Sequence, residues 1–358
     1  MTATTVVPES LTVVITTSPT PSAPSIDLVS LVVASFRKHC PVLLACRVIV
    51  IFDSYDHVVP KARLKKGQVT QEVAKNYDIY KENVKDFILS QFAPREEPGA
   101  LQQGQGEAEY GSPMIASNVV AFKTSWTADK HVTFIEPSAR LGFGLAVRSA
   151  LRMLETPYVW IHQHDWALLA DIPVDGLLEV MQDSKSDKTL PVNYVCFPSV
   201  RMLSYAETVN AMDFPALKAL TISLRREFAV KSRPEVRIPL TPIFFWHDKP
   251  HIACAAHYLA RAFPSRLAMP RGAFIEDTIG QRARHQMKDG NWHKWACWLY
   301  YPDDGKRLCL RHLQGRTWKG KDAEQARKDY WQTYNADRLS RAGTKLETLE
   351  ICEDDTEI

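Results

Sequence analysis

Short apolar runs alternate with amphipathic segments along the first half of the chain. Leu11–Thr17 and Cys46–Phe52 are rich in β-branched residues and predict buried strands. Between them, Ile26–His39 carries apolar residues at helical spacing, with Ser25 as a plausible N-cap. This strand–loop–helix–strand order predicts a βαβ unit with two parallel strands.

The same alternation continues to about residue 170. It predicts helices at Val73–Phe92 and Gly144–Glu155, and short strands at Asn118–Phe122, His131–Ile135 and Tyr158–Ile161. Ala93–Pro113 is rich in Gly, Gln, Glu and Pro and predicts a loop or an insertion. We therefore expect an α/β fold with an open, mainly parallel, twisted sheet of Rossmann-like type flanked by helices.

The second half of the chain is less regular. It predicts helices at Val174–Met181, Leu217–Phe228, His251–Ala262 and Thr278–Lys288, strands at Val192–Phe197 and Leu240–Trp246, and a buried aromatic segment at Trp292–Tyr301. A charged helix within 321–342 forms a C-terminal helical extension, and residues 343–358 form an acidic, disordered tail. Residues 1–10 are expected to be disordered.

Composition narrows the class of protein. Of 358 residues, 45% are hydrophobic and 24% charged, which suits a globular domain, and a net charge of only +3 gives no electrostatic case for nucleic acid. Seven scattered cysteines without a Cys-x-x-Cys pair indicate a reducing compartment. Neither a signal peptide nor a membrane-spanning run is recognisable. We expect a soluble, cytoplasmic protein without a transmembrane segment.

The densest chemistry lies in Thr156–Trp166, TPYVWIHQHDW. The predicted strand Tyr158–Ile161 runs directly into His162, Gln163, His164 and Asp165. The carboxyl edge of a parallel sheet is the usual place for a ligand crevice. Imidazole and carboxylate groups together at such an edge indicate a bound divalent cation.

Three further features follow the same logic. Thr17 and Ser18 end the first strand in a small polar loop, and Asp53 follows the second strand, where its carboxylate could bind a ribose or base or serve as a turn residue. In RLGFGLAVR, Arg140 to Arg148, Gly142 permits a close approach to a ligand and Arg148 could hold a phosphate or be a solvated helix residue.

The last feature is the adjacent acidic pair Glu276–Asp277 in FIEDTIGQR. A carboxylate in a dry cleft can act as general base on a hydroxyl, although such a pair at a helix start can also simply cap the helix.

In this order, the runs VVITTSP, VIVIFD, AVRSALRMLETPYVWIHQHD and FIEDTIGQR resemble the GT-A glycosyltransferases, particularly the inverting, family-2-like enzymes. Arg148 matches the arginine of that family, and Asp165 matches the last acid of its Asp-x-Asp motif. Gln163 stands where the family has the first acid. The resemblance covers roughly residues 11–285. It implies a GT-A domain with a nucleotide-sugar-binding half, 11–170, and an acceptor-binding half, 171–320.

The resemblance also implies roles. The donor, a UDP- or GDP-sugar, would be bound by Thr17, Ser18, Asp53, Arg140, Gly142, Arg148, Gln163 and His164. A divalent metal would be held by Asp165 and His164, with His312 as a later ligand, and such a His/Asp set suits Mn²⁺ better than Mg²⁺. Asp277, or Glu276, would be the base in an inverting transfer of a hexosyl or pentosyl group. Trp166, Trp246, His247 and Asp248 would contact the glycan or other hydroxyl acceptor.

Two alternatives stay open from the sequence. A metal-dependent hydrolase could use His162, His164 and Asp165. A non-catalytic GT-A-like module that binds a nucleotide or glycan is favoured slightly by Gln163, whereas the acidic pair Glu276–Asp277 argues against it.

Overall fold

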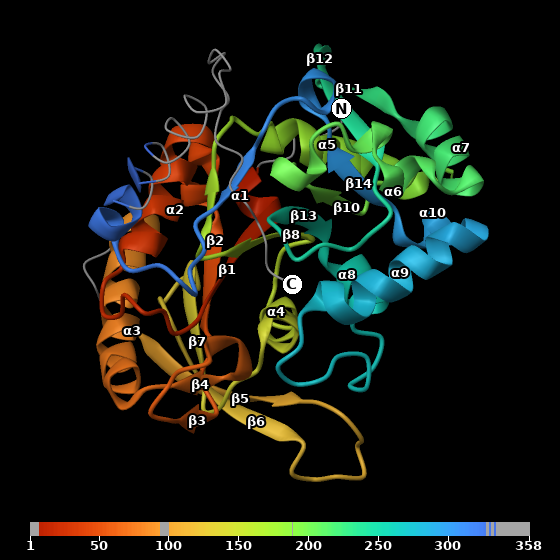
Figure 1. Cartoon of the computed structure of the whole chain (residues 1–358). Helices are drawn as coiled ribbons and strands as arrows, with labels where there is room; N and C mark the ends of the chain where they lie inside the picture. Colours follow the sequence, from red (N-terminus) through yellow and green to blue (C-terminus); the bar gives the residue numbers. More distant parts are fainter. Residues whose placement is uncertain (1–6, 94–99, 188, 327–328, 331–332, 334–358) are drawn as a thin grey trace.

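A single large sheet organises the protein (Figure 1). The computed structural model describes residues 7–93, 100–187, 189–326, 329–330 and 333. The sheet's centre consists of four parallel strands, in the order β8 (Tyr158–Gln163), β1 (Leu11–Thr17), β2 (Arg47–Phe52) and β7 (Val132–Pro137). All seven residues of β1 are buried, because helices cover both faces of the sheet at this point.

Antiparallel and parallel strands extend the sheet on both sides. Next to β8 lie β13 (His251–Cys254), β10 (Tyr194–Cys196), β14 (Cys297–Tyr300), β12 (Arg233–Pro242) and β11 (Arg226–Val230); next to β7 lie β6 (Val119–Trp126) and β5 (Gln102–Glu109). In this sheet of the described chain, β6, β12 and β13 run opposite to the other eight strands. The predicted mainly parallel sheet is thereby confirmed.

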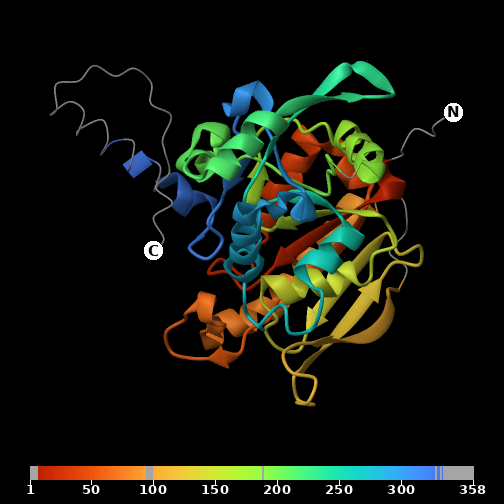
Figure 2. The ribbon, with the colours of Figure 1, turned by 90° about the vertical axis from the view of Figure 1, so that its right-hand side faces the viewer.

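Helices form a layer on each face of the sheet. Figure 1 shows α2 (Asp27–His39) and α3 (Gln71–Phe92) on one side, and α4 (Phe143–Leu151), α8 (Ala255–Ala262) and α9 (Gln281–Gln286) on the other. Helices α4 and α8 are in contact, as Figure 2 shows. The expected flanking of the sheet by helices is therefore confirmed.

Further α-helices and two small sheets complete the regular structure, apart from short 3-10 and π-helical turns. They are the helices α1 (Val7–Ser10), α5 (Val174–Asp183), α6 (Val209–Met212), α7 (Pro215–Leu224) and α10 (Trp292–Trp295), and the sheets β3 (His57–Val58) with β4 (Gln68–Val69) and β9 (Trp166–Leu168) with β15 (Leu310–His312). The β9–β15 pair places the segment after residue 309 next to the end of β8, because β9 directly follows β8 in the chain.

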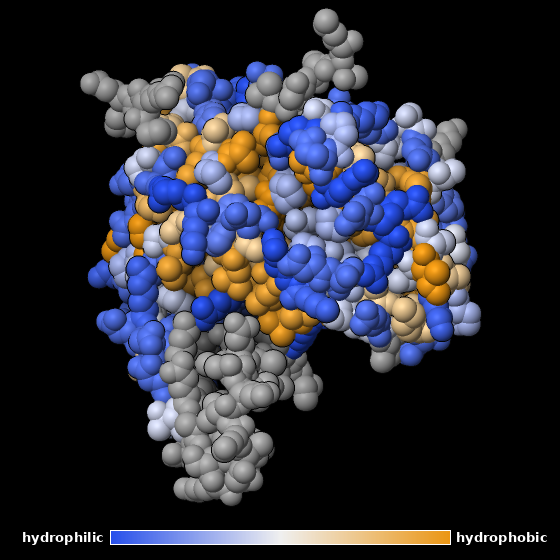
Figure 3. All heavy atoms as spheres, turned by 90° about the horizontal axis from the view of Figure 1, so that it is seen from above, coloured by the Kyte–Doolittle hydropathy of each residue, from blue (hydrophilic) through white to orange (hydrophobic). Residues whose placement is uncertain are grey.

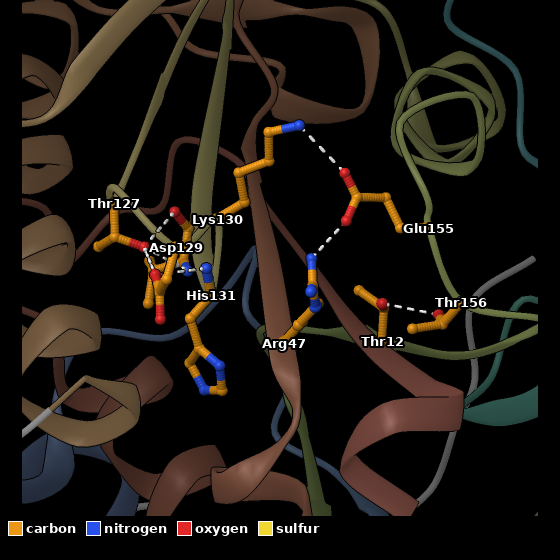
Figure 4. A network of polar contacts seen from close by, with 9 residues as sticks. Thr12, Arg47, Thr127, Asp129, Lys130, His131, Glu155 and Thr156 are labelled. Carbon is orange, nitrogen blue, oxygen red and sulfur yellow. Dashed lines mark hydrogen bonds and ion pairs between the residues drawn. The ribbon is translucent and has the colours of Figure 1, made fainter.

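Polar contacts tie the strands together at their amino ends (Figure 4). The Thr12 and Thr156 hydroxyls lie 2.8 Å apart, joining β1 to the segment before β8. Glu155 accepts from Arg47 at 2.5 Å and from Lys130 at 3.1 Å. These contacts set the register of the parallel strands at the edge opposite to their carboxyl ends.

The structure corrects several predicted elements. Gln102–Glu109, expected in a loop, is strand β5, because the Trp126 and Phe122 rings of β6 occupy the space beside Gly104 and Gly106. The segment lacks the alternation of apolar and polar residues that usually predicts a strand, and it is a strand because it pairs with β6. His251–Cys254 is a strand, and only Ala255–Ala262 is helical. The helix predicted over Leu217–Phe228 ends at Leu224, and β11 follows.

The chain ends are described only in part. Residues 7–10, expected to be disordered, form α1, whereas residues 1–6 lie outside the described part. Of the helix predicted within 321–342, residues 321–326 are helical and most of the remainder lies outside the described residues, as does the acidic tail 343–358.

The outer surface is of mixed polarity. Figure 3 shows one face on which apolar residues interrupt a largely hydrophilic surface, a normal pattern that does not by itself indicate a partner. Within the described ranges, none of the helices has both the length and the apolar composition that crossing a bilayer requires.

Candidate active site

A cleft of about 880 Å³ lies at the carboxyl ends of β1, β2 and β8. It contains fourteen of the residues proposed from sequence: Thr17, Ser18, Asp53, Arg140, Gly142, Gln163, His164, Asp165, Trp166, His247, Asp248, Glu276, Asp277 and His312. Both halves of the chain contribute, so the residues assigned to the donor, the acceptor and the metal share one cavity. Its size suits a ligand of nucleotide-sugar dimensions.

Asp165 is the centre of the polar cluster at the end of β8. Its Oδ2 accepts hydrogen bonds from His312 Nε2 at 3.1 Å and from the Gly315 backbone N–H at 3.0 Å. Burial opposes ionisation, but the His312 hydrogen bond and the neighbouring imidazoles hold the pKa of Asp165 well below its usual range. Asp165 is therefore a buried carboxylate that stays charged, and its Oδ1 has no hydrogen-bond partner.

His164 presents a bare ring nitrogen beside this carboxylate. Its Nδ1 lies 3.2 Å from the Thr16 carbonyl oxygen, which can only accept, so Nδ1 carries the proton and Nε2 is left as an acceptor. Nε2 is buried without a hydrogen-bond partner. Burial lowers the pKa of His164, which keeps the ring neutral near pH 7.

The space in front of these atoms is open because residue 315 is glycine. A Cβ at Gly315 would lie 2.8 Å from His164 Nε2 and 3.0 Å from Asp165 Oδ2. The 3.1 Å separation of His312 Nε2 and Asp165 Oδ2 matches the roughly 3 Å between two atoms that bind one metal at about 2.1 Å. Among the described residues, however, no three His, Cys, Asp or Glu side chains are already gathered as a metal site. The atoms that could contact an ion in this space are those of His164, Asp165 and His312, and an ion there would replace the proton that His312 Nε2 donates to Asp165 Oδ2.

Asp53 and Arg140 hold the loops that form one wall of the cleft. Asp53 accepts from the backbone N–H groups of Leu141, at 2.6 Å, and Gly142, at 3.0 Å, and burial raises its pKa to about 6. Arg140 Nη2 donates to the carbonyl oxygens of Lys65 and Gly272, both at 3.0 Å. Both side chains line the cleft, but the bonds that they make are to the protein backbone.

Gly142 is required where these loops meet. Its φ of +78° and ψ of 163° fall in a region that is essentially restricted to glycine. A Cβ there would also lie 2.4 Å from the Cα of Gly272. The close approach proposed from sequence is therefore an approach to another loop of the protein.

The acidic pair, which also lines the cleft, begins a π-helical turn, Glu276–Gly280. Glu276 Oε2 lies 3.6 Å from His247 Nδ1 and accepts from the Asp248 backbone N–H at 3.3 Å. Burial opposes ionisation, but the contact with His247 brings the pKa of Glu276 below its usual value. Asp277, the next residue, is exposed to the cleft.

Asp248 is buried beneath this pair. Its Oδ1 accepts from the Glu276 backbone N–H at 3.2 Å, and only 4% of the residue is exposed. Burial and the charge of Glu276 raise its pKa well above the usual value. Asp248 is thus placed to hold the acidic turn, while Asp277 is the most exposed of the three carboxylates in this part of the cleft.

Two residues proposed from sequence lie elsewhere. Arg148 is 1% exposed and does not line the cleft, because every residue of α4 is buried. Its side chain faces the β5–β6 hairpin, where its Nη2 donates to the Glu109 carbonyl oxygen of β5. Trp246 is fully buried, with its ring packed against Tyr194 and Tyr258. The structure therefore does not bring these two residues, predicted to contact the phosphate and the acceptor, into the cleft with the others.

His162, the residue on which the hydrolase alternative depends, also points into the core. It is fully buried, its Nδ1 accepts from the Trp160 indole at 3.0 Å and its Nε2 lies 2.7 Å from the Trp166 carbonyl oxygen. Both nitrogens are therefore used in structural hydrogen bonds, and His162 cannot join His164 and Asp165 at a metal.

Sequence reasoning missed several cleft residues: Lys65, Arg201, Tyr205, Phe244, Phe245, Lys249, Arg284, Gly315 and Arg316. Most stand in loops or helices without a recognisable motif. Gly315 and Arg316 had a usable signal, since they stand three and four residues after the predicted ligand His312 in the run RHLQGR.

Comparisons with known proteins add a fold likeness. The sequence matches no protein-family model and no curated protein. Among solved structures, TarS of S. aureus in complex with UDP-GlcNAc is similar at 9% identity and a TM-score of 0.41, over 87% of this chain and 60% of that one. A mannosyltransferase from Pyrobaculum calidifontis in complex with GDP-Man and Mn²⁺ is similar at 11% identity and a TM-score of 0.37, over 83% and 58%. The chain thus spans less than two thirds of these proteins, and the functional argument rests on the cleft.

Proposed function

We propose that the protein is a glycosyltransferase that moves a sugar from a nucleotide-sugar donor to an acceptor hydroxyl. The observation that carries this proposal is the single cleft that Asp165, His164 and His312 share with Asp277. One end offers groups for a diphosphate and its metal, and the other offers an exposed carboxylate for a hydroxyl. The hexosyl or pentosyl nature of the sugar is left to a donor screen.

At the donor end, we assign a divalent cation site to Asp165 and His164, with His312 as a third ligand. An ion bound there supplies positive charge against the negative charge that builds on the leaving diphosphate. The neutral imidazole of His164 and the ionised Asp165 are in the protonation states that a metal requires. Nitrogen and oxygen donors together favour Mn²⁺ over Mg²⁺.

At the acceptor end, Asp277 is the proposed general base. It takes the proton of the acceptor hydroxyl as the oxygen bonds to the anomeric carbon and the bond from that carbon to the diphosphate breaks. Direct attack from the opposite face gives inversion. Glu276 is less suited to this role, because its Oε2 already contacts His247 and the Asp248 N–H.

The first experiment tests the donor. We expect UDP- or GDP-sugars with Mn²⁺ to raise the unfolding midpoint, since a ligand at 100 times its Kd adds about 2.7 kcal/mol to the free energy of unfolding. Differential scanning fluorimetry with a panel of nucleotide sugars measures this. No shift with any of them would reject the transferase proposal.

The second experiment separates a transferase from a binding module. Asp277→Asn should reduce release of free nucleotide in the presence of an acceptor by at least about 100-fold, while the donor-induced shift of the midpoint remains. Asp86→Asn, at an exposed position of α3 outside the cleft, is the matched control and should retain both. Full activity in Asp277→Asn would exclude this residue as the base.

A further inference from the structure

Gln163, which stands where the resembling family has an acid, makes a hydrogen bond that an acid cannot make. It is the last residue of β8, and its side-chain Nε2 donates to the Asp248 carbonyl oxygen at 3.0 Å. A carbonyl oxygen only accepts, so it needs a donor opposite. An ionised carboxylate has no donor, and an Asp side chain is also one methylene shorter.

The segment held by Gln163 in turn holds the acidic pair. The Asp248 backbone N–H donates to Glu276 Oε2 at 3.3 Å, and Asp248 Oδ1 accepts from the Glu276 backbone N–H at 3.2 Å. These reciprocal bonds join a loop to the start of the π-helical turn at two points. Because Asp248 is 4% exposed, water competes little for either bond.

The two connections form a continuous chain of hydrogen bonds along the cleft wall. It runs from Gln163, two residues before Asp165, through Asp248 to Glu276, next to Asp277. We propose that Gln163 is a positioning residue, which through Asp248 and Glu276 fixes the distance between the donor-binding end and the carboxylate that acts on the acceptor. This inference rests on the proposed function for its catalytic meaning, but the chain of hydrogen bonds itself is a property of the fold.

The inference gives the departure from the Asp-x-Asp pattern a physical reason. With His164 and His312 beside Asp165, the atoms that fit a metal do not include residue 163. Residue 163 can therefore be a glutamine, whose side-chain amide links the end of β8 to Asp248. Restoring the family's acid should therefore weaken the enzyme.

The test compares Gln163→Met, which removes the donor without adding charge, with Gln163→Asp, which restores the acid. Both should lower kcat by about 10- to 100-fold, because small displacements of reacting groups cost this much. In Gln163→Met, the KM for the donor should change less than about threefold, since the donor-binding groups remain. Gln105→Met and Gln105→Asp, at an exposed position of β5 outside the cleft, are the matched controls.

Hydrogen exchange supplies a readout that does not need activity. Amides of residues 247–249 and 275–280 should exchange faster in both Gln163 variants than in the wild type or the Gln105 controls. Unchanged exchange in both segments, or a Gln163→Asp enzyme as active as the wild type, would overturn the inference. If the wild type neither bound nor consumed a nucleotide sugar, the proposed function would fail, while the exchange data would still decide whether Gln163 holds Asp248 and Glu276.

Discussion

Gly315 leaves space beside the proposed metal ligands His164 and Asp165. Its Cβ position is 2.8 Å from His164 Nε2, and its φ is not in the left-handed region, so Gly315→Ala tests the space alone. We expect this variant to bind Mn²⁺ at least about tenfold more weakly in the presence of donor, because the added methyl group would displace the proposed ligand His164, and disturbing the groups that orient a ligand typically costs this much. Isothermal titration of Mn²⁺ measures the change.

Gly290→Ala is the control for this experiment, because among the described residues no atom beyond its own stretch of chain lies within 4 Å of its Cβ position. It should bind Mn²⁺ as the wild type does. Chelation should likewise remove the metal-dependent part of the donor-induced midpoint shift in the wild type. Unaltered Mn²⁺ affinity in Gly315→Ala would show that the ion, if bound, lies elsewhere in the cleft.

At the level of residues, sequence identified positions better than orientations. Asp165, His164 and Asp277 lie in the cleft because they follow, or stand close to, recognisable elements whose ends meet at one edge of the sheet. Arg148 and Trp246 are buried and do not line the cleft. A helical or apolar pattern shows that a residue can be buried, but the direction of a particular side chain depends on packing partners that are distant in sequence.

At the level of elements, the wall of the cleft depends on the contact between the Gly142 and Gly272 loops. Gly142→Ala adds a Cβ 2.4 Å from the Gly272 Cα and forces alanine into a glycine-only conformation. We expect the free energy of unfolding to fall by about 3 kcal/mol or more. Urea unfolding followed by tryptophan fluorescence measures this fall.

Gly290→Ala is again informative, since Gly290 also has a positive φ, +81°, but no neighbour within 4 Å. In Gly290→Ala, the free energy of unfolding should fall by only about 1 kcal/mol, which is the cost of backbone strain alone. Equal losses in the two variants would mean that conformation alone, and not the contact between the loops, limits residue 142.

Elements with strong local patterns were predictable, and those formed by pairing were not. Leu11–Thr17 was predicted with its observed bounds, because a run of β-branched residues has few alternatives. Strand β5 was missed because its glycines and glutamines become a strand only beside Phe122 and Trp126 of β6. His251–Cys254 was read as helix, although its position between β8 and β10 makes it a buried strand.

At the level of the whole molecule, the two predicted halves form one sheet. Strands β10, β13 and β14 come from the second half, yet β13 pairs directly with β8 of the first half. Separating the halves would expose the edge of β8 and the buried side chains around Trp160. The boundary near residue 170 therefore does not divide the folding unit.

This continuity predicts a single unfolding transition. Calorimetry of the full chain should give one peak whose van't Hoff and calorimetric enthalpies agree, and a bound nucleotide sugar should move the whole peak upward. A fragment of residues 1–170 should lack cooperative unfolding, because the β8 edge and its apolar side chains lose their cover. Two separate peaks, of which the donor shifted only one, would contradict this view and would place the donor site within a half that is stable by itself.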